Sequence, residues 1–137
     1  MNPHKKRILV VDDEPGITRM LKLNLEQTGE FVVQVENAAL HALTAALAFQ
    51  PDLILLDVLM PGVDGGQLAA HFQASPRLEK VPIIFLTAAA TKQEVNSHGG
   101  QIGGLEFLAK PVDIPEIIAC LKHHLGNGPT AEGCPPD

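Results

Sequence analysis

The sequence predicts a single domain of the α/β class, in which helices cover both faces of a parallel β-sheet. Short apolar runs rich in β-branched residues alternate with segments whose apolar residues recur at helical spacing. Five such strand and helix pairs follow one another with short connections, the pattern of parallel strands joined by crossover helices. The chain has 137 residues, of which 45% are hydrophobic and 19% charged, and this suits one domain with one core.

The first half of the chain contains two strand and helix pairs. The first strand is predicted at 8–11, a continuous apolar run typical of a strand that is buried on both faces. A helix then starts at Pro15, a residue favoured in the first turn, and stops at Gly29. The second strand is predicted at 31–35, and an alanine-rich helix follows at 38–49, ending before a proline.

The second half repeats the same alternation. It predicts strands at 53–56, 81–86 and 105–108, and helices at 67–73, 91–98 and 114–125. The helix at 91–98 is the weakest because its residues are modest helix formers, so we expect a mobile segment at 91–104. A domain at 1–125 would then be followed by a polar, Gly/Pro-rich segment at 126–137, expected to be a flexible tail or the start of a linker.

Composition and charge restrict the possible partners and location. The formal net charge is −6 and the isoelectric point about 5.4, so direct binding to nucleic acid or to an anionic membrane surface is not expected. No apolar run approaches the ~20 residues that cross a bilayer. The first apolar run is interrupted at once by the acids 12–14, which excludes a secretory signal there. We therefore expect a cytoplasmic protein.

Polar residues stand at the ends of four predicted strands. Asp12 and Asp13 follow the first strand, Asp57 the third, Thr87 the fourth, and Lys110 lies just after the fifth. Each residue alone has a simpler explanation, such as a helix cap or a turn. However, the carboxyl ends of parallel strands meet at one edge of the sheet, and three carboxylates placed together repel unless a cation neutralises them. Oxygen ligands of this kind suit Mg²⁺, which is the cofactor that the sequence predicts.

These residues carry a resemblance to a known family. Asp57 in LLDVLMPGVDG, Thr87 in FLTAA and Lys110 in GGLEFLAKP, together with the acid pair at 12–13, resemble the receiver domain of bacterial two-component response regulators over about residues 6–125. The resemblance implies a flavodoxin-like, doubly wound, five-stranded parallel sheet with strand order 2-1-3-4-5 and five helices. It also implies a Mg²⁺-dependent phosphoryl transfer to Asp57 from a sensor histidine kinase or a histidine phosphotransfer protein.

The resemblance assigns a ligand set for the metal. It implies that Asp13, Asp57 and the backbone carbonyl of Leu59 coordinate Mg²⁺ directly, while Asp12 acts largely through a bound water. Lys110 would supply a positive charge to a phosphoryl oxygen, a role that suits its ammonium group. The domain would catalyse only its own phosphorylation and dephosphorylation, and would not otherwise be an enzyme.

The resemblance also implies how the phosphorylated domain signals. Thr87 would donate its hydroxyl to a phosphoryl oxygen and move toward it, and Phe107 would turn inward as a switch residue. The signal would pass to a downstream effector or output domain that the sequence does not name. Recognition of the kinase would involve the start of the first helix, where four residues would face outward: Pro15, Thr18, Arg19 and Lys22.

Three other functions share some of these features. A haloacid-dehalogenase-like phosphotransferase also uses an aspartate at a strand end with Mg²⁺, but it needs a second acid two residues later, where this chain has Leu59. A flavin-binding domain of flavodoxin type is disfavoured because the chain has no Trp or Tyr to stack on the cofactor. A pseudo-receiver, which acts only through protein contacts, is disfavoured by the complete acidic set.

Overall fold

The computed structural model describes most of the chain. The described residues are 5–57, 59–60, 63–87, 101–102, 105–109 and 113–125. Side chains are described within 5–57, 67–86 and 113–125 and at 108. The helix predicted at 91–98 and the tail predicted at 126–137 lie outside these residues. Among the described helices, none is long and apolar enough to cross a membrane.

The described elements agree closely with the predicted ones. The main strands are β1 (Lys6–Val11), β2 (Phe31–Glu36), β3 (Leu53–Asp57), β6 (Ile83–Thr87) and β8 (Leu105–Ala109). The α-helices are α1 (Pro15–Gln27), α2 (Ala42–Phe49), α3 (Gly65–Ala74) and α5 (Ile114–His124), and a short 3₁₀ helix, η1 (Ala39–His41), precedes α2. The boundaries differ from the predictions by one or two residues in most cases, which is the usual uncertainty at the ends of elements.

The sheet has the predicted topology. Its order is β2-β1-β3-β6-β8-β7, and the first five strands pair in parallel, which confirms the order 2-1-3-4-5. The sequence did not predict the two-residue strand β7 (Gln101–Ile102), which pairs antiparallel with β8. It also did not predict the strands β4 (Leu59–Met60) and β5 (Val63–Asp64), which form a small antiparallel hairpin. Pairs of this length are too short to show an alternating pattern.

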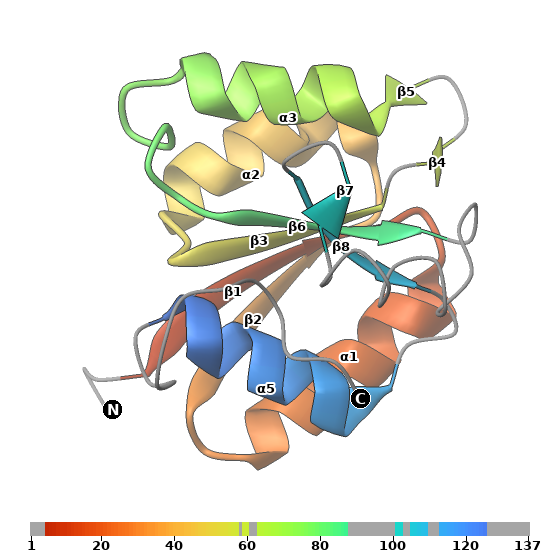
Figure 1. Cartoon of the computed structure of the whole chain (residues 1–137). Coiled ribbons are helices and arrows are strands. Elements are labelled where there is room, and N and C mark those ends of the chain that lie inside the picture. The colour runs from red at the N-terminus through yellow and green to blue at the C-terminus, as the bar shows by residue number, and fades with distance from the viewer. Residues whose placement is uncertain are drawn as a thin grey trace.

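Helices cover both faces of the sheet, and each face has its own core. Figure 1 shows α2 and α3 on one face, and α1 and α5 on the other. Successive residues of a strand point to opposite faces, so β1 supplies Ile8 and Val10 to the core beneath α1 and α5, and Leu9 and Val11 to the core beneath α2 and α3. The central strands are buried on both sides, which explains their continuous apolar sequences.

Truncating a core residue of β3 is expected to destabilise the fold strongly. Leu55 is fully buried and lies beside Val10 and Ile84 in the sheet, so Leu55→Ala would leave a cavity that rigid neighbours cannot fill. We expect a loss of about 2–5 kcal/mol in the free energy of unfolding, measured by urea denaturation. Leu40 is 86% exposed, so Leu40→Ala is the matched control and should change stability by less than about 0.5 kcal/mol. Equal effects at the two positions would contradict this account of the core.

Two side chains of α1 cover part of the sheet edge at β2. Lys22 Nζ donates to the main-chain oxygen of Val33 at 2.7 Å and to Glu26 Oε2 at 3.0 Å. Glu26 Oε2 in turn accepts from the main-chain nitrogen of Val33 at 3.0 Å. The main-chain groups of an edge strand would otherwise be open to pairing with another chain. The Lys22–Glu26 pair therefore joins α1 to β2 and blocks the edge at Val33.

This contact is expected to make stability depend on pH. Partial burial raises the pKa of Glu26, but the hydrogen bond from Val33 and the nearby Lys22 outweigh it, so the pKa lies below its ordinary value of 4.5. A lowered pKa in the folded state stabilises the protein above pH 4.5, and this contribution is lost as the pH falls through the lowered value. Glu26→Gln should therefore be less stable than wild type near neutral pH, with the difference vanishing in acid.

Urea denaturation at a series of pH values would measure this difference. Glu79→Gln removes the same charge from an exposed position and controls for the change in net charge. A stability difference between Glu26→Gln and wild type that stays constant from neutral to acidic pH would contradict the assignment.

Candidate functional site

Three acids meet at the carboxyl edge of the sheet. Asp12 and Asp13 follow β1 directly, and Asp57 is the last residue of β3, the strand beside β1. Each acid offers a carboxylate oxygen, and these oxygens all lie within 4.8 Å of one another. Asp12 and Asp57 are buried, with 0% and 3% of their surface exposed, and Asp13 is half-buried. The structure thus brings together the acids that the sequence analysis expected to meet.

Main-chain hydrogen bonds and one asparagine hold the loop after β1. The Asp12 nitrogen donates to the main-chain oxygen of Glu36 at 3.2 Å, which extends the pairing of β1 with β2. Asp12 Oδ1 accepts from the nitrogen of Glu14 at 3.0 Å, and the Asp12 main-chain oxygen accepts from Asn37 Nδ2 at 2.8 Å. No feature of the sequence singles out Asn37, because an asparagine after a strand is common in turns.

The remaining predicted site residues are only partly described. Thr87 ends β6 and pairs with Ala109, the last residue of β8, while its neighbour Leu86 pairs with Asp57. The backbone of Thr87 therefore lies at the same sheet edge as the acids. Lys110 lies outside the described residues, as do the side chains of Thr87, Leu59 and Phe107. Their predicted roles stay predictions.

One predicted surface position is wrong. Pro15, Arg19 and Lys22 are exposed on α1, as expected for a surface that meets a partner, but Thr18 is only 1% exposed. The Thr18 hydroxyl donates to the main-chain oxygen of Pro15 at 3.1 Å and accepts from Asn37 Nδ2 at 3.0 Å. Thr18 faces inward because it precedes the buried Leu21 by three residues and the buried Leu25 by seven, which places it on the inner side of the helix.

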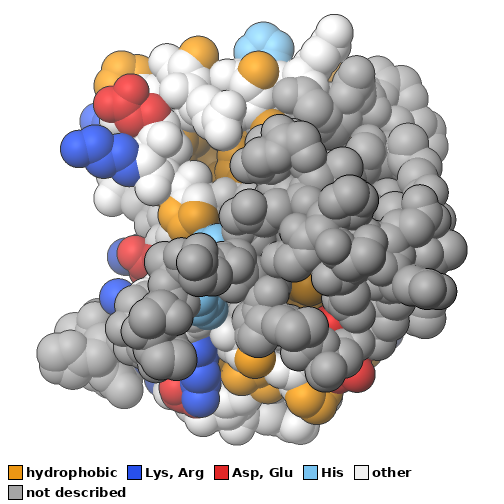
Figure 2. Space-filling model, viewed as in Figure 1, with side chains coloured by type: hydrophobic (Ala, Val, Ile, Leu, Met, Phe, Trp, Pro, Cys, Tyr) orange, Lys and Arg blue, Asp and Glu red, His pale blue; other side chains and the backbone are white. Residues whose placement is uncertain are grey.

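Among the described residues on the face shown in Figure 2, the Lys and Arg side chains do not form one continuous basic surface. On the described part of that face, the Lys and Arg side chains lie in separate groups, with acidic and hydrophobic side chains and white atoms between them. This distribution agrees with the net charge of −6.

The acidic cluster fits a hard divalent cation. Its donors are carboxylate oxygens only, and hard cations such as Mg²⁺ prefer oxygen ligands over nitrogen or sulfur. Close, partly buried carboxylates repel one another, and a bound cation would remove this repulsion. The donor set and its charge thus suit Mg²⁺ at the position where the sequence analysis expected it.

Comparisons with known proteins agree with this fold. The family model of the response regulator receiver domain matches residues 8–122. The chain is 34% identical over 116 residues to the DNA-binding dual master transcriptional regulator RpaA of Synechocystis, covering 85% of this chain and 47% of RpaA. It is 35% identical over 117 residues to the phosphate regulon transcriptional regulatory protein PhoB of Pseudomonas aeruginosa, covering 85% of this chain and 50% of PhoB. The chain spans about half the length of these curated relatives.

A solved structure has the same fold. A putative response regulator from Chloroflexus aurantiacus superposes with a TM-score of 0.75 at 30% identity, covering 89% of this chain and 98% of that protein. The fold and the site define an α/β domain with an acidic cluster at the carboxyl edge of its sheet. With the family match, they show that the chain belongs to the response regulator receiver domain family and functions as the receiver of a two-component system. Neither the dehalogenase-like nor the flavin-binding alternative agrees with this match.

Proposed function

We propose that Asp57 is the residue that accepts the phosphoryl group, in a Mg²⁺-dependent transfer from a phosphohistidine of a sensor kinase or a phosphotransfer protein. The observation that carries this proposal is the position of Asp57 at the end of β3, with a carboxylate oxygen within 4.8 Å of those of Asp12 and Asp13. Every residue of β3 is buried. The strand therefore holds the carboxylate in place while the loops around it supply the other groups.

The transfer requires a nucleophile and little other covalent chemistry from the protein. An oxygen of the Asp57 carboxylate attacks phosphorus while the phosphorus–nitrogen bond of the donor phosphohistidine breaks, and the bonding pair stays on the imidazole nitrogen. The product is an acyl phosphate on Asp57. The loose transition state of phosphoryl transfer is stabilised mainly by positioning and by neutralising charge.

The acidic cluster would hold the metal ion for this transfer. Asp13 and Asp57 would coordinate Mg²⁺ with the backbone carbonyl of Leu59, and Asp12 would act through a water. When bound, the ion supplies positive charge to the acids and to the oxygens of the phosphoryl group. Lys110 and the Thr87 hydroxyl would bind other phosphoryl oxygens, and these contacts would make Thr87 and Phe107 the switch that reports phosphorylation.

The domain would act in the cytoplasm and signal to another protein or domain. Residues 1–125 form the receiver under this proposal, and 126–137 form a tail or the start of a linker. The relatives named above are DNA-binding or transcriptional regulators of about twice the matched length. An output domain of that kind, or a separate effector, would respond to the phosphorylated receiver. The receiver itself would catalyse only the gain and loss of its own phosphate.

A small phosphodonor tests the proposed function directly. The full chain is incubated with acetyl phosphate and Mg²⁺ and then analysed by intact mass spectrometry. We expect one phosphoryl group per chain, stable in acid and lost in base as an acyl phosphate is, and no gain when EDTA removes the metal. A pseudo-receiver would gain no phosphate under either condition, and that result would overturn the proposal.

A further inference from the structure

Asn37 uses both hydrogens of its side-chain amide beside the acidic site. It directly follows β2, and its Nδ2 donates to the main-chain oxygen of Asp12 at 2.8 Å and to Thr18 Oγ1 at 3.0 Å. The amide group of asparagine carries two donor hydrogens, so these two bonds use its full donor capacity. The side chain therefore bridges the acidic loop and helix α1.

The α1 end of this bridge is firmly anchored. Thr18 is buried, and its hydroxyl also donates to the main-chain oxygen of Pro15 at 3.1 Å. A hydroxyl has one hydrogen and two lone pairs, so it can donate to Pro15 and accept from Asn37 at the same time. The bridge thus ties the acidic loop to the buried side of α1.

The other end of the bridge holds the peptide unit that joins Asp12 to Asp13. A peptide unit is planar, so fixing its oxygen restrains the backbone rotation on both sides of it. These rotations set the directions in which the side chains of both acids leave the chain. Without the bond from Asn37, repulsion among the carboxylates would favour rotations that move Asp13 away from Asp57.

We infer that Asn37 is a positioning residue for the metal site, and that the Asp12–Asn37–Thr18 bridge raises the affinity of the acidic cluster for Mg²⁺. This inference rests on the proposed function because it concerns the same site. Asn37 does not touch the reacting atoms. It acts by keeping the two acids after β1 in the arrangement that a cation needs, as outer-shell hydrogen bonds do at other metal sites.

Magnesium affinity in Asn37→Ala tests the inference. Asn37 is exposed, so its truncation leaves no cavity in the core. We expect Mg²⁺ to bind about tenfold more weakly, as measured by isothermal titration calorimetry of the full chain. Phosphorylation by acetyl phosphate should slow by a similar factor at low Mg²⁺ and recover when Mg²⁺ is saturating, a pattern that a general loss of stability would not produce.

A second variant removes the other end of the bridge. Thr18→Val keeps the shape of the buried side chain and removes the hydroxyl that accepts from Asn37. It should weaken Mg²⁺ binding in the same direction. The double variant should bind Mg²⁺ little more weakly than Asn37→Ala alone, because both changes break one connected unit. If the losses of Mg²⁺ affinity in the two single variants added fully in the double variant, the two residues would act separately. This result would overturn the inference that they form one bridge.

Asn24→Ala is the matched control. Asn24 lies on α1 and its Nδ2 donates to the main-chain oxygen of Met20 at 2.7 Å, so the variant removes the same kind of bond away from the acids. Its Mg²⁺ affinity should equal that of wild type. Wild-type affinity in Asn37→Ala, or an equal loss in Asn24→Ala, would overturn the inference and leave the proposed function standing. A wild-type domain that binds no Mg²⁺ would overturn both.

Discussion

Replacing Asp57 with asparagine is expected to abolish phosphorylation of the domain. Asparagine has nearly the same shape as aspartate, but its neutral amide is a far weaker nucleophile than a carboxylate and cannot form the same acyl phosphate. The variant should fold, because it also removes one charge from a cluster of three close acids. Intact mass spectrometry after incubation with acetyl phosphate and Mg²⁺ should show no phosphoryl group on Asp57→Asn, and one on the wild type.

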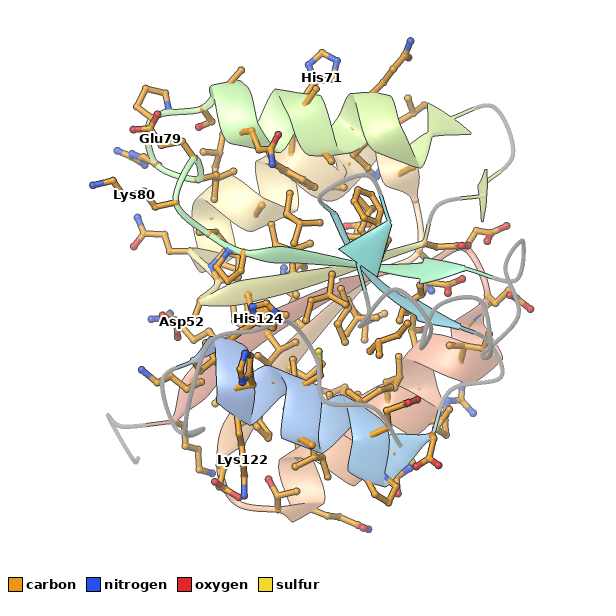
Figure 3. The ribbon with its side chains drawn as sticks, in the orientation of Figure 1. Asp52, His71, Glu79, Lys80, Lys122 and His124 are labelled. Carbon is orange, nitrogen blue, oxygen red and sulfur yellow. The ribbon has the colours of Figure 1, made fainter. Side chains whose placement is uncertain are left out.

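Asp52→Asn is the control for this change. Asp52 lies at the opposite end of β3 from the acidic cluster, and Figure 3 shows it near the start of that strand. Its Oδ2 accepts from the main-chain nitrogen of Arg7 at 2.8 Å, a bond that an amide oxygen can still accept. Asp52→Asn should be phosphorylated as the wild type is. A base-labile phosphate on Asp57→Asn at the wild-type yield would show that another residue is the acceptor.

Replacing Asp13 with asparagine is expected to weaken Mg²⁺ binding on the order of a hundredfold. One unit of charge about 4 Å away is worth several kcal/mol at the effective dielectric near a protein surface. The variant removes this charge together with one of the proposed ligand oxygens. Titration calorimetry measures the affinity. The rate of phosphorylation at low Mg²⁺ should fall together with the Mg²⁺ affinity, because without the ion the oxygens of the phosphoryl group lack their main neutralising charge.

The same variant should change stability in opposite directions with and without the metal. In EDTA, Asp13→Asn should be more stable than wild type, because one of three repelling carboxylates is neutral. At saturating Mg²⁺ the wild type should become the more stable protein, because a ligand that binds only the folded state adds to its stability. Urea denaturation in the two buffers measures this reversal.

Glu79→Gln controls for the loss of one negative charge. Glu79 lies in the segment between α3 and β6, at the end of the sheet opposite the carboxyl ends of its strands (Figure 3). Its effect on stability should be small and equal in the two buffers. If Asp13→Asn also changed stability equally in EDTA and in Mg²⁺, the acid at position 13 would not be a metal ligand.

Much of the fold could be predicted from the sequence because the signals were local and strong. Buried parallel strands give continuous apolar runs such as Ile8 to Val11, and surface helices give a period of 3.6 residues. The meeting of Asp12, Asp13 and Asp57 was also predictable, since it follows from parallel pairing of the strands that they end. The strand order came from the resemblance to receivers, and the sheet confirms it.

Other features depend on pairings that no local pattern reports. The two-residue strand β7 and the β4–β5 hairpin exist because short segments meet across a turn, and two residues are too few to show alternation. The resemblance to receivers placed Thr18 on the outer surface of the first helix, yet Thr18 is buried and its hydroxyl bonds to Pro15 and Asn37. Asn37 gave no signal because its two acceptors lie 25 and 19 residues away in the chain.

The sequence by itself determined the class of the fold, the sheet edge at which the acids stand and the kind of ion that they suit. These properties follow from periodicity, from parallel pairing and from the chemistry of carboxylates. Only the tertiary structure decided how the acids are held. The peptide unit after Asp12 accepts a bond from Asn37, and this bond forms only when the end of β2 and the buried side of α1 pack beside it.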